Sequence, residues 1–128
     1  MPEPPILLAK WYDYAKWIVE RVDSFSKNQR FIFGQRLAAH ALDIMELLVE
    51  AAYARDKAAL LHTANRKIEM LRWLVRMAKD RTLFTARQYE FSCEKLEECG
   101  RMTGGWLKTA RKKSAESPLS GPPEDARE

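Results

Sequence analysis

The sequence predicts an all-α protein, and three observations support that prediction. All six prolines lie near the ends of the chain, so none interrupts residues 6–117. Within that span, apolar residues recur at steps of three and four, which is the spacing of one helix face. No stretch shows the sustained alternation, rich in β-branched residues, that is typical of strands. Because the connections between the helical stretches are short, the predicted fold is an antiparallel up-down-up-down four-helix bundle.

The first two predicted helices cover residues 5–53. The first runs from about Pro5 to Ser24 and is apolar on nearly all of its faces. The second begins near Ser26, where Ser26 and Gln29 match the S-x-x-Q capping box, and continues to about Tyr53. Its inward stripe is predicted to contain Phe31, Leu37, Ala38, Ala41, Met45, Leu48 and Ala52.

The third and fourth predicted helices complete the bundle. The third runs from about Asp56, a candidate N-cap, to Asp80. The fourth begins at Thr85, where Gln88 completes a second capping box, and runs to about Arg111. We therefore expect residues 1–112 to form the bundle. Residues 113–128 are acidic and proline-rich, and we expect them to be a disordered tail.

Some apolar residues exceed what one bundle core requires. The first helix has apolar residues well beyond a single stripe, and Phe33, Trp73 and Phe84 fall off the main stripes of their segments. Burial between subunits of an oligomer would account for this second apolar surface. The alternative is that these side chains lie at the edge of the bundle with their polar ends in water.

The charge distribution suggests an anionic partner. The net charge is +4, but residues 114–128 carry four acidic residues and one arginine, so residues 1–113 carry +7. A soluble surface that happens to be basic is the alternative.

Cys93 and Cys99 form no recognisable disulfide framework, and we interpret them as reduced thiols of a cytoplasmic protein. The start of the chain predicts neither a signal peptide nor a membrane span.

No catalytic or metal-binding constellation is evident. His40 and His62 both lack the glutamate three residues earlier that di-metal bundles use. The phosphate-binding loop, the G-x-S-x-G elbow and the H-E-x-x-H zinc motif do not occur. We therefore predict a protein that is not an enzyme and that needs no cofactor or metal.

The cations are better organised than the carboxylates. Steps of four and three place one group of cations on one face of the third helix, and a second group shares a face of the fourth. Such stripes can neutralise phosphates or dock an acidic protein. The alternative is that these cations serve solubility, together with the general preference of helix C-termini for cations. The two groups are Arg72, Arg76 and Lys79 on the third helix, and Arg101, Lys108 and Lys112 on the fourth, with Arg111 adjacent.

Three glycines in GRMTGGWLK raise a question about the fourth helix. Gly100 and Gly104 are four residues apart, so they predict a smooth helix-packing patch, with Gly34 as a candidate counterpart. Gly105 lies on another side of the helix. The alternative is that the helix ends at Gly104 and Gly105 with a left-handed cap.

Three segments resemble a known family. They are KNQRFIFGQRL at 27–37, LRWLVRMAKD at 71–80 and YEFSCEKLEECGRMTGGWLK at 89–108. Together they resemble the accessory variability determinant proteins of diversity-generating retroelements. That family is related to the four-helix bundle proteins encoded by intervening sequences in bacterial large-subunit ribosomal RNA genes. The resemblance spans residues 11–110.

The resemblance implies a barrel-shaped homopentamer of four-helix bundles with a basic surface. It implies an accessory protein that binds the reverse transcriptase and nucleic acid, either template RNA or cDNA, and supports mutagenic retrohoming. By position, Arg76, Lys79, Arg101 and Lys108 match the family's basic segments, and Arg30, Gly34 and Arg36 match its RFxxGQR segment. The ribosomal relatives imply the alternative, which is a bundle acting as a structural or protein-interaction module.

Overall fold

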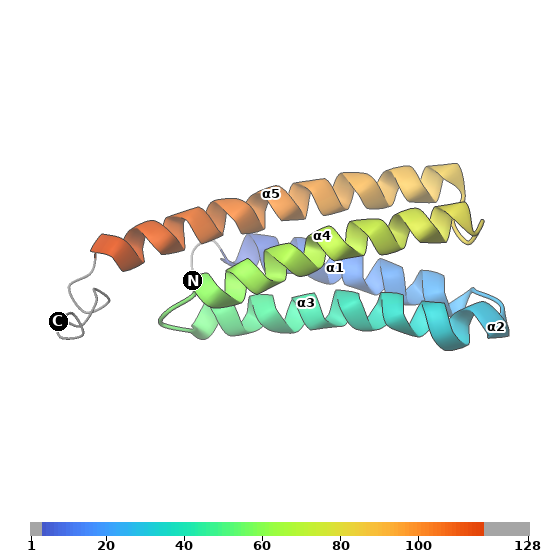
Figure 1. The fold of residues 1–128 in the computed structure, drawn as a ribbon, viewed down its shortest axis with the longest axis horizontal. Coiled ribbons are helices and arrows are strands. Elements are labelled where there is room, and N and C mark those ends of the chain that lie inside the picture. Colours follow the sequence, from blue (N-terminus) through green and yellow to red (C-terminus); the bar gives the residue numbers. More distant parts are fainter. Residues whose placement is uncertain (1–3, 117–128) are drawn as a thin grey trace.

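The computed structural model describes residues 4–116, which are helical apart from short connections and contain no strand. The elements are α1 (Pro4–Asp23), α2 (Lys27–Gln29), the π-helix η1 (Arg30–Gly34), α3 (Gln35–Tyr53), α4 (Ala58–Asp80) and α5 (Ala86–Glu116). Because α2, η1 and α3 follow one another without a break, four long segments lie lengthwise together (Figure 1). Contacts link α1 to α3, α3 to α4, α4 to α5, and α5 back to α1. The prediction of an all-α bundle is confirmed.

The second long segment contains a π-turn that the apolar spacing did not predict. The predicted Ser26 capping box is wrong, because the Ser26 side chain makes no capping hydrogen bond. Gln29 instead accepts a hydrogen bond from the Arg81 guanidinium. A π-turn holds one more residue than an α-turn, so it rotates the preceding residues relative to those that follow. Phe31 therefore leaves the predicted inward stripe, and its side chain is 68% exposed.

The start of α5 follows its prediction. The backbone N–H of Gln88 donates to the Thr85 hydroxyl, and the backbone N–H of Thr85 donates to the Gln88 side chain, each at 3.0 Å. This reciprocal pair is the predicted capping box, and it satisfies two backbone donors at the helix terminus. At the start of α4, Asp56 accepts a hydrogen bond of 3.4 Å from the backbone N–H of Ala58.

The core explains most of the unusual apolar character of α1. This helix contacts both α3 and α5, so two of its sides are covered within the chain. Trp17 packs against Phe84 and Phe91, with ring centroids 5.6 and 4.9 Å away. Phe84, which the sequence pattern assigned to a second surface, is buried in the core and also lies near Phe25. The prediction that Phe84 belongs to a second apolar surface is therefore wrong.

Two buried polar side chains of α1, Trp11 and Tyr14, have hydrogen-bond partners on neighbouring helices. The Trp11 indole N–H donates to the carbonyl of Ala41 at 2.9 Å, which ties α1 to α3. The hydroxyls of Tyr14 and Ser92 share a hydrogen bond of 2.6 Å, which ties α1 to α5. Burial raises the pKa of Tyr14 well above its ordinary value, and burial raises the pKa of Cys99 to about 11. Cys99 is therefore a protonated core thiol at neutral pH rather than a nucleophile.

The last helix is longer than predicted. It passes through Gly104 and Gly105 and reaches Glu116, so residues 113–116 of the expected tail are helical. Neither glycine has a positive φ, which excludes the left-handed cap. In Figure 1, the end of α5 extends beyond the neighbouring helices. The rest of the predicted tail, residues 117–128, lies outside the described residues.

Among the helices that the structure describes, none combines the length and the apolar character that crossing a bilayer requires.

Candidate nucleic-acid and partner interface

Arg72 is a bridge between α4 and α5 rather than a free surface cation. Its guanidinium donates to the carbonyl of Leu96 at 3.5 Å, and its Nε lies 3.7 Å from the Glu69 carboxylate. A Cβ added to Gly100 would lie 3.3 Å from Nη2 of Arg72. Gly100 therefore leaves space for the Arg72 guanidinium to lie against α5.

The other two predicted cations of α4 also have neighbours within the chain. Arg76 forms an exposed ion pair with Asp80, with 3.7 Å between nitrogen and oxygen. The Lys79 ammonium lies over the Tyr89 ring, 5.2 Å from its centroid. Both side chains are exposed, and exposed ion pairs of this kind contribute only about 0–1 kcal/mol. A phosphate could therefore compete with Asp80 for Arg76 at little cost in stability.

The predicted cations of α5 divide into Arg101, which has a carboxylate partner, and a group nearer the end of the helix. Arg101 forms an ion pair with Glu97 at 3.4 Å. Nearer the end of the helix, Nη2 of Arg111 lies 3.5 Å from Nδ1 of His62 on α4. This contact is not an ion pair with a carboxylate. No carboxylate occurs between residues 99 and 115. We name the four exposed cations between residues 108 and 113 the α5-end cluster: Lys108, Arg111, Lys112 and Lys113.

The structure separates the two predicted groups of cations instead of merging them. Lys79 lies near Tyr89 at the start of α5, and Arg72 lies near Leu96 at the middle of that helix. Arg111 lies near His62 at the start of α4. The α5-end cluster is therefore at the opposite end of the bundle from Arg76 and Lys79.

Arg30 and Arg36 lie on the second long segment but in different settings. The Arg30 guanidinium donates to the carbonyls of Asp23 and Phe25, at 3.5 and 3.4 Å, and so closes the turn after α1. Arg36 lines a groove of about 670 Å³ between η1, α3 and α4. Its guanidinium has no carboxylate partner among residues 4–116, so Arg36 is available to an external anion.

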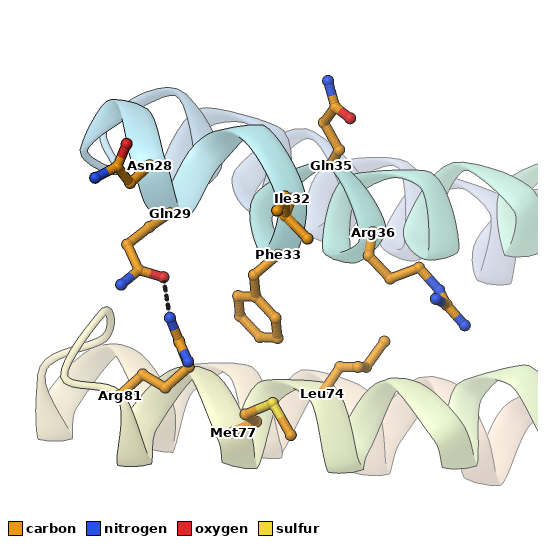
Figure 2. Close-up of a pocket in the computed structure, with 9 residues that line it drawn as sticks. All are labelled: Asn28, Gln29, Ile32, Phe33, Gln35, Arg36, Leu74, Met77 and Arg81. Atoms are coloured by element: carbon orange, nitrogen blue, oxygen red, sulfur yellow. Dashed lines mark hydrogen bonds between the residues drawn. The ribbon is translucent and has the colours of Figure 1, made fainter.

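Sequence reasoning missed Arg81, the second cation of this groove. Its guanidinium binds the Gln29 side chain and lies 5.8 Å from the centroid of the Phe33 ring. In Figure 2, Phe33 extends from η1 toward α4, where Leu74 and Met77 lie below it. Leu74, Met77 and Arg81 are spaced by three and four residues, so the helix pattern alone could have placed Arg81 on this side of α4.

The predicted helix-packing glycines have three different environments. A Cβ on Gly34 would lie 2.9 Å from Val22 and 3.3 Å from Phe25, so this glycine permits close packing of η1 on α1 and the following turn. Gly34 is thus not the counterpart of Gly100, which faces Arg72 and Ile68. Nothing lies within 4 Å of a Cβ on Gly104 or Gly105, so the predicted patch at Gly104 packs against no helix of this chain.

His40 is the one mostly buried histidine of the described residues. Its Nε2 lies out of contact with solvent and has no hydrogen-bond partner. Burial, with smaller contributions from the charges of Lys67 and Arg36, lowers the pKa of His40 below its ordinary value. Within residues 4–116, no three His, Cys, Asp or Glu side chains gather as metal ligands would.

Comparison with known proteins identifies a family. A family model described as bAvd-like matches residues 6–110, and this match confirms the resemblance that the three sequence segments indicate. No curated protein and no solved structure matches the chain.

Proposed function

The chain belongs to the bAvd-like family, and on that premise we propose that it is a non-enzymatic accessory protein of a diversity-generating retroelement. In this role it binds the reverse transcriptase of the element and nucleic acid, and it supports the mutagenic copying of template RNA into cDNA. The two cysteines are free thiols, which supports a place in the reducing cytoplasm.

The α5-end cluster is the observation that best supports nucleic-acid binding. Four cations lie within six residues of an exposed helix end, and the nearest carboxylates along the chain are Glu98 before them and Glu116 after them. Lysines and arginines in such a group release counterions from a phosphate backbone without reading its sequence. Arg36 and Lys79 add exposed positive charge elsewhere on the bundle. Arg76 and Arg101 contribute less, since each is paired with a carboxylate of its own helix.

A salt series tests this proposal. The wild-type protein is titrated with single-stranded RNA of mixed sequence at increasing salt concentration. Affinity should fall steeply, with a slope of about −0.7 for each phosphate contact. A variant with Lys108→Gln, Arg111→Gln and Lys112→Gln should bind more weakly and with a shallower slope. The control, Arg76→Gln with Arg101→Gln, removes two charges instead of three, and it should change both quantities less for each charge removed.

Three outcomes bear on the proposal in different ways. Affinity that does not depend on salt, or no binding at all, would contradict phosphate recognition. A larger effect in this control, for each charge removed, would move the interface to the C-terminal part of α4 and the middle of α5. Copurification of the chain with the reverse transcriptase encoded beside it tests the second partner, and failure to copurify would count against that part of the proposal.

We further propose that the functional form is a barrel-shaped homopentamer of up-down-up-down bundles. Large apolar side chains that remain exposed support an assembly, among them Ile32 at 75% and Trp73 at 64%. Light scattering should give about five times the chain mass of 14.9 kDa. A mass equal to that of one chain would rule the assembly out.

The alternative function is that of a structural or protein-interaction module, like the ribosomal intervening-sequence proteins. The ion pairs of Arg76 and Arg101 favour it, because they reduce the charge that these residues offer to phosphate. The presence of a reverse transcriptase gene with paired template and variable repeats beside the coding sequence would decide against this alternative.

A further inference from the structure

The α5-end cluster concentrates positive charge on a short stretch of helix. Lys108, Arg111 and Lys112 are spaced by three and four residues, so they share one face of α5, and Lys113 lies beside them. All four side chains are exposed. The end of α5 also extends beyond the neighbouring helices (Figure 1). The cluster is therefore open to a charged partner.

Little negative charge compensates the cluster within the bundle. Among residues 6–115, whose side chains the structure describes, no carboxylate lies within 4.0 Å of the four cations. Glu98, the nearest carboxylate before the cluster along α5, binds Lys10 at 2.9 Å. The contact of Arg111 with His62 brings the start of α4 to this end of the bundle. Residues 55–57, which precede α4, hold two cations and one carboxylate, a sum of +1.

The residues that follow α5 have the opposite charge. Residues 117–128 read SPLSGPPEDARE and contain Glu124, Asp125 and Glu128 against Arg127 alone, a sum of −2. The dipeptides Ser-Gly and Gly-Pro at 120–122 are typical of a change in chain direction. The sequence thus places three carboxylates after a turn signal, a short distance along the chain from four cations.

These carboxylates are within reach of the cluster. Lys108 is eight residues before Glu116, which corresponds to about 12 Å along the helix at about 1.5 Å per residue. At about 3.3 Å per residue, a chain that leaves α5 over residues 117–120 moves about 13 Å away from its end. Residues 121–128 can then cover about 26 Å in return. That span is enough to bring Glu124 to the end of the helix and Glu128 to the level of Lys108.

We propose that residues 117–128 fold back on the α5-end cluster of the same chain, where their carboxylates occupy the positions that nucleic-acid phosphates take. This inference rests on the proposed binding of nucleic acid, and it names the regulation of that site. Charge complementarity and chain length commit the cluster to this occupant. Because the segment is attached to its own binding surface, it is present there at a high effective concentration.

The physical consequence is a competition that short or weak polyanions lose. Exposed ion pairs are individually weak, so the segment is released when a partner offers more phosphates than the segment has carboxylates. An extended RNA therefore displaces the segment, whereas an isolated phosphate or a short anion does not. Salt screens the contact of the segment with the cluster, so the competition should fade as the salt concentration rises.

Zero-length cross-linking tests the contact in the absence of RNA. A carbodiimide joins a carboxylate to an amine when the two are in contact. The full chain should therefore give links from the carboxylates of residues 124–128 to the lysines of the α5-end cluster, mapped by mass spectrometry. In a mixture of isotopically light and heavy chains, the links should join residues of one chain. Added single-stranded RNA of mixed sequence should suppress them.

Neutralisation of the segment tests the competition. The full-length variant with Glu124→Gln, Asp125→Asn and Glu128→Gln should bind the same RNA about three- to ten-fold more tightly than the wild type near 0.1 M salt, because the exposed ion pairs of the segment no longer compete. The gain should shrink toward none at high salt, where screening releases the segment from the wild-type cluster as well.

A matched control removes the same charge at the other end of the bundle. The variant with Asp23→Asn, Glu90→Gln and Glu94→Gln changes three exposed carboxylates far from the cluster. Its RNA affinity should rise by less than about two-fold, because charges separated by more than about 10 Å are largely screened at 0.1 M salt. Circular dichroism equal to that of the wild type shows that each variant is folded.

A combined variant shows whether the segment acts through the cluster. In the background of Lys108→Gln, Arg111→Gln and Lys112→Gln, neutralisation of residues 124–128 should give no further gain in affinity. A gain of full size in that background, or in the matched control, would mean that the carboxylates repel RNA without occupying the cluster, and would overturn the inference. Absence of the cross-links, or links only between different chains, would overturn it as well.

Failure of the proposed function is a separate result. If neither the wild type nor the neutralised variant binds RNA at any salt concentration, nucleic-acid binding is refuted, and the cross-links alone then support or refute the contact of the segment with the cluster. If only the neutralised variant binds RNA, the segment masks the site in the wild type, and that result supports both proposals.

Discussion

Gly34 and Gly104 both lie within helical segments, yet substitution should affect them in opposite directions. Gly34→Ala places a Cβ 2.9 Å from Val22 and 3.3 Å from Phe25, so the packing of η1 must shift. Overpacking of this kind costs about 1–3 kcal/mol. Gly104→Ala meets nothing within 4 Å and replaces a poor helix former, so it should stabilise by about 0.5–1 kcal/mol. Urea unfolding at one protein concentration measures both, and equal effects would contradict the packing role of Gly34.

His40 should make stability depend on pH between about 5.5 and 7.5. Burial is the largest cause that lowers its folded pKa, followed by the charge of Lys67 and, more weakly, that of Arg36, while the backbone of Lys67 and the charge of Asp43 oppose this effect. As pH falls through the ordinary value near 6.5, the unfolded chain binds a proton that the folded chain resists. The free energy of unfolding should therefore fall on acidification in the wild type.

The His40→Gln variant is the control for this prediction, because glutamine does not titrate. Urea unfolding of both proteins at pH 7.5 and at pH 5.5 should show a smaller loss of stability in the variant. Parallel losses in the two proteins would show that other groups cause the pH dependence.

At the scale of the element, the two S/T-x-x-Q patterns have opposite outcomes. Thr85 and Gln88 make reciprocal hydrogen bonds with the backbone, whereas the Ser26 side chain makes no capping bond. Thr85→Ala should therefore destabilise by about 0.5–2 kcal/mol, the usual cost of a lost N-cap. Ser26→Ala is the matched control and should change the free energy of unfolding by only a few tenths of a kcal/mol. Chemical denaturation compares them, and a larger loss at Ser26 would refute this reading of the two helix starts.

The reason for the difference between the two patterns lies in their surroundings. Gln29 lies across from Arg81, which is 52 residues away in the chain, and its side-chain oxygen accepts from that guanidinium. A hydrogen bond to a charged donor is stronger than one to a neutral amide. The Gln29 side chain, which would complete the Ser26 capping box, is therefore bound to Arg81 at the C-terminal end of α4 instead.

At the scale of the whole molecule, assembly and nucleic-acid binding should be coupled. A symmetric oligomer presents several copies of the α5-end cluster to one RNA, and binding at one copy raises the effective concentration at the next. Leu42→Glu places a charge at an exposed apolar position and should weaken the proposed assembly. This variant should therefore bind a long single-stranded RNA at least ten-fold more weakly than the wild type, although its cluster is unchanged. Fluorescence anisotropy at constant salt measures the difference.

The length of the RNA provides the control for this coupling. An oligonucleotide too short to reach two copies should bind the wild type and Leu42→Glu with the same affinity per chain. An equal loss for short and long RNA would show that Leu42→Glu damages the binding surface itself, which contradicts the proposed coupling of assembly to RNA binding.

The sequence by itself determined most of the helices, the family and part of the proposed binding surface. Helix positions follow from the spacing of apolar residues and from the placement of proline, which are properties of neighbouring residues. The same is true of the Thr85 capping box and of three cations of the α5-end cluster, Lys108, Arg111 and Lys112. Lys113 was assigned to the tail, and the structure places it in α5.

Only the tertiary structure decided which surfaces those helices present. The π-turn exposes Phe31, and the packing of α1 between α3 and α5 buries Phe84. The same packing gives Gly34 a close neighbour and Gly104 none. Arg81 joins Arg36 in one groove because α4 lies beside η1. These outcomes depend on how each helix is rotated and placed against helices distant in the chain, and the periodicity of a single helix does not specify that rotation to within one residue.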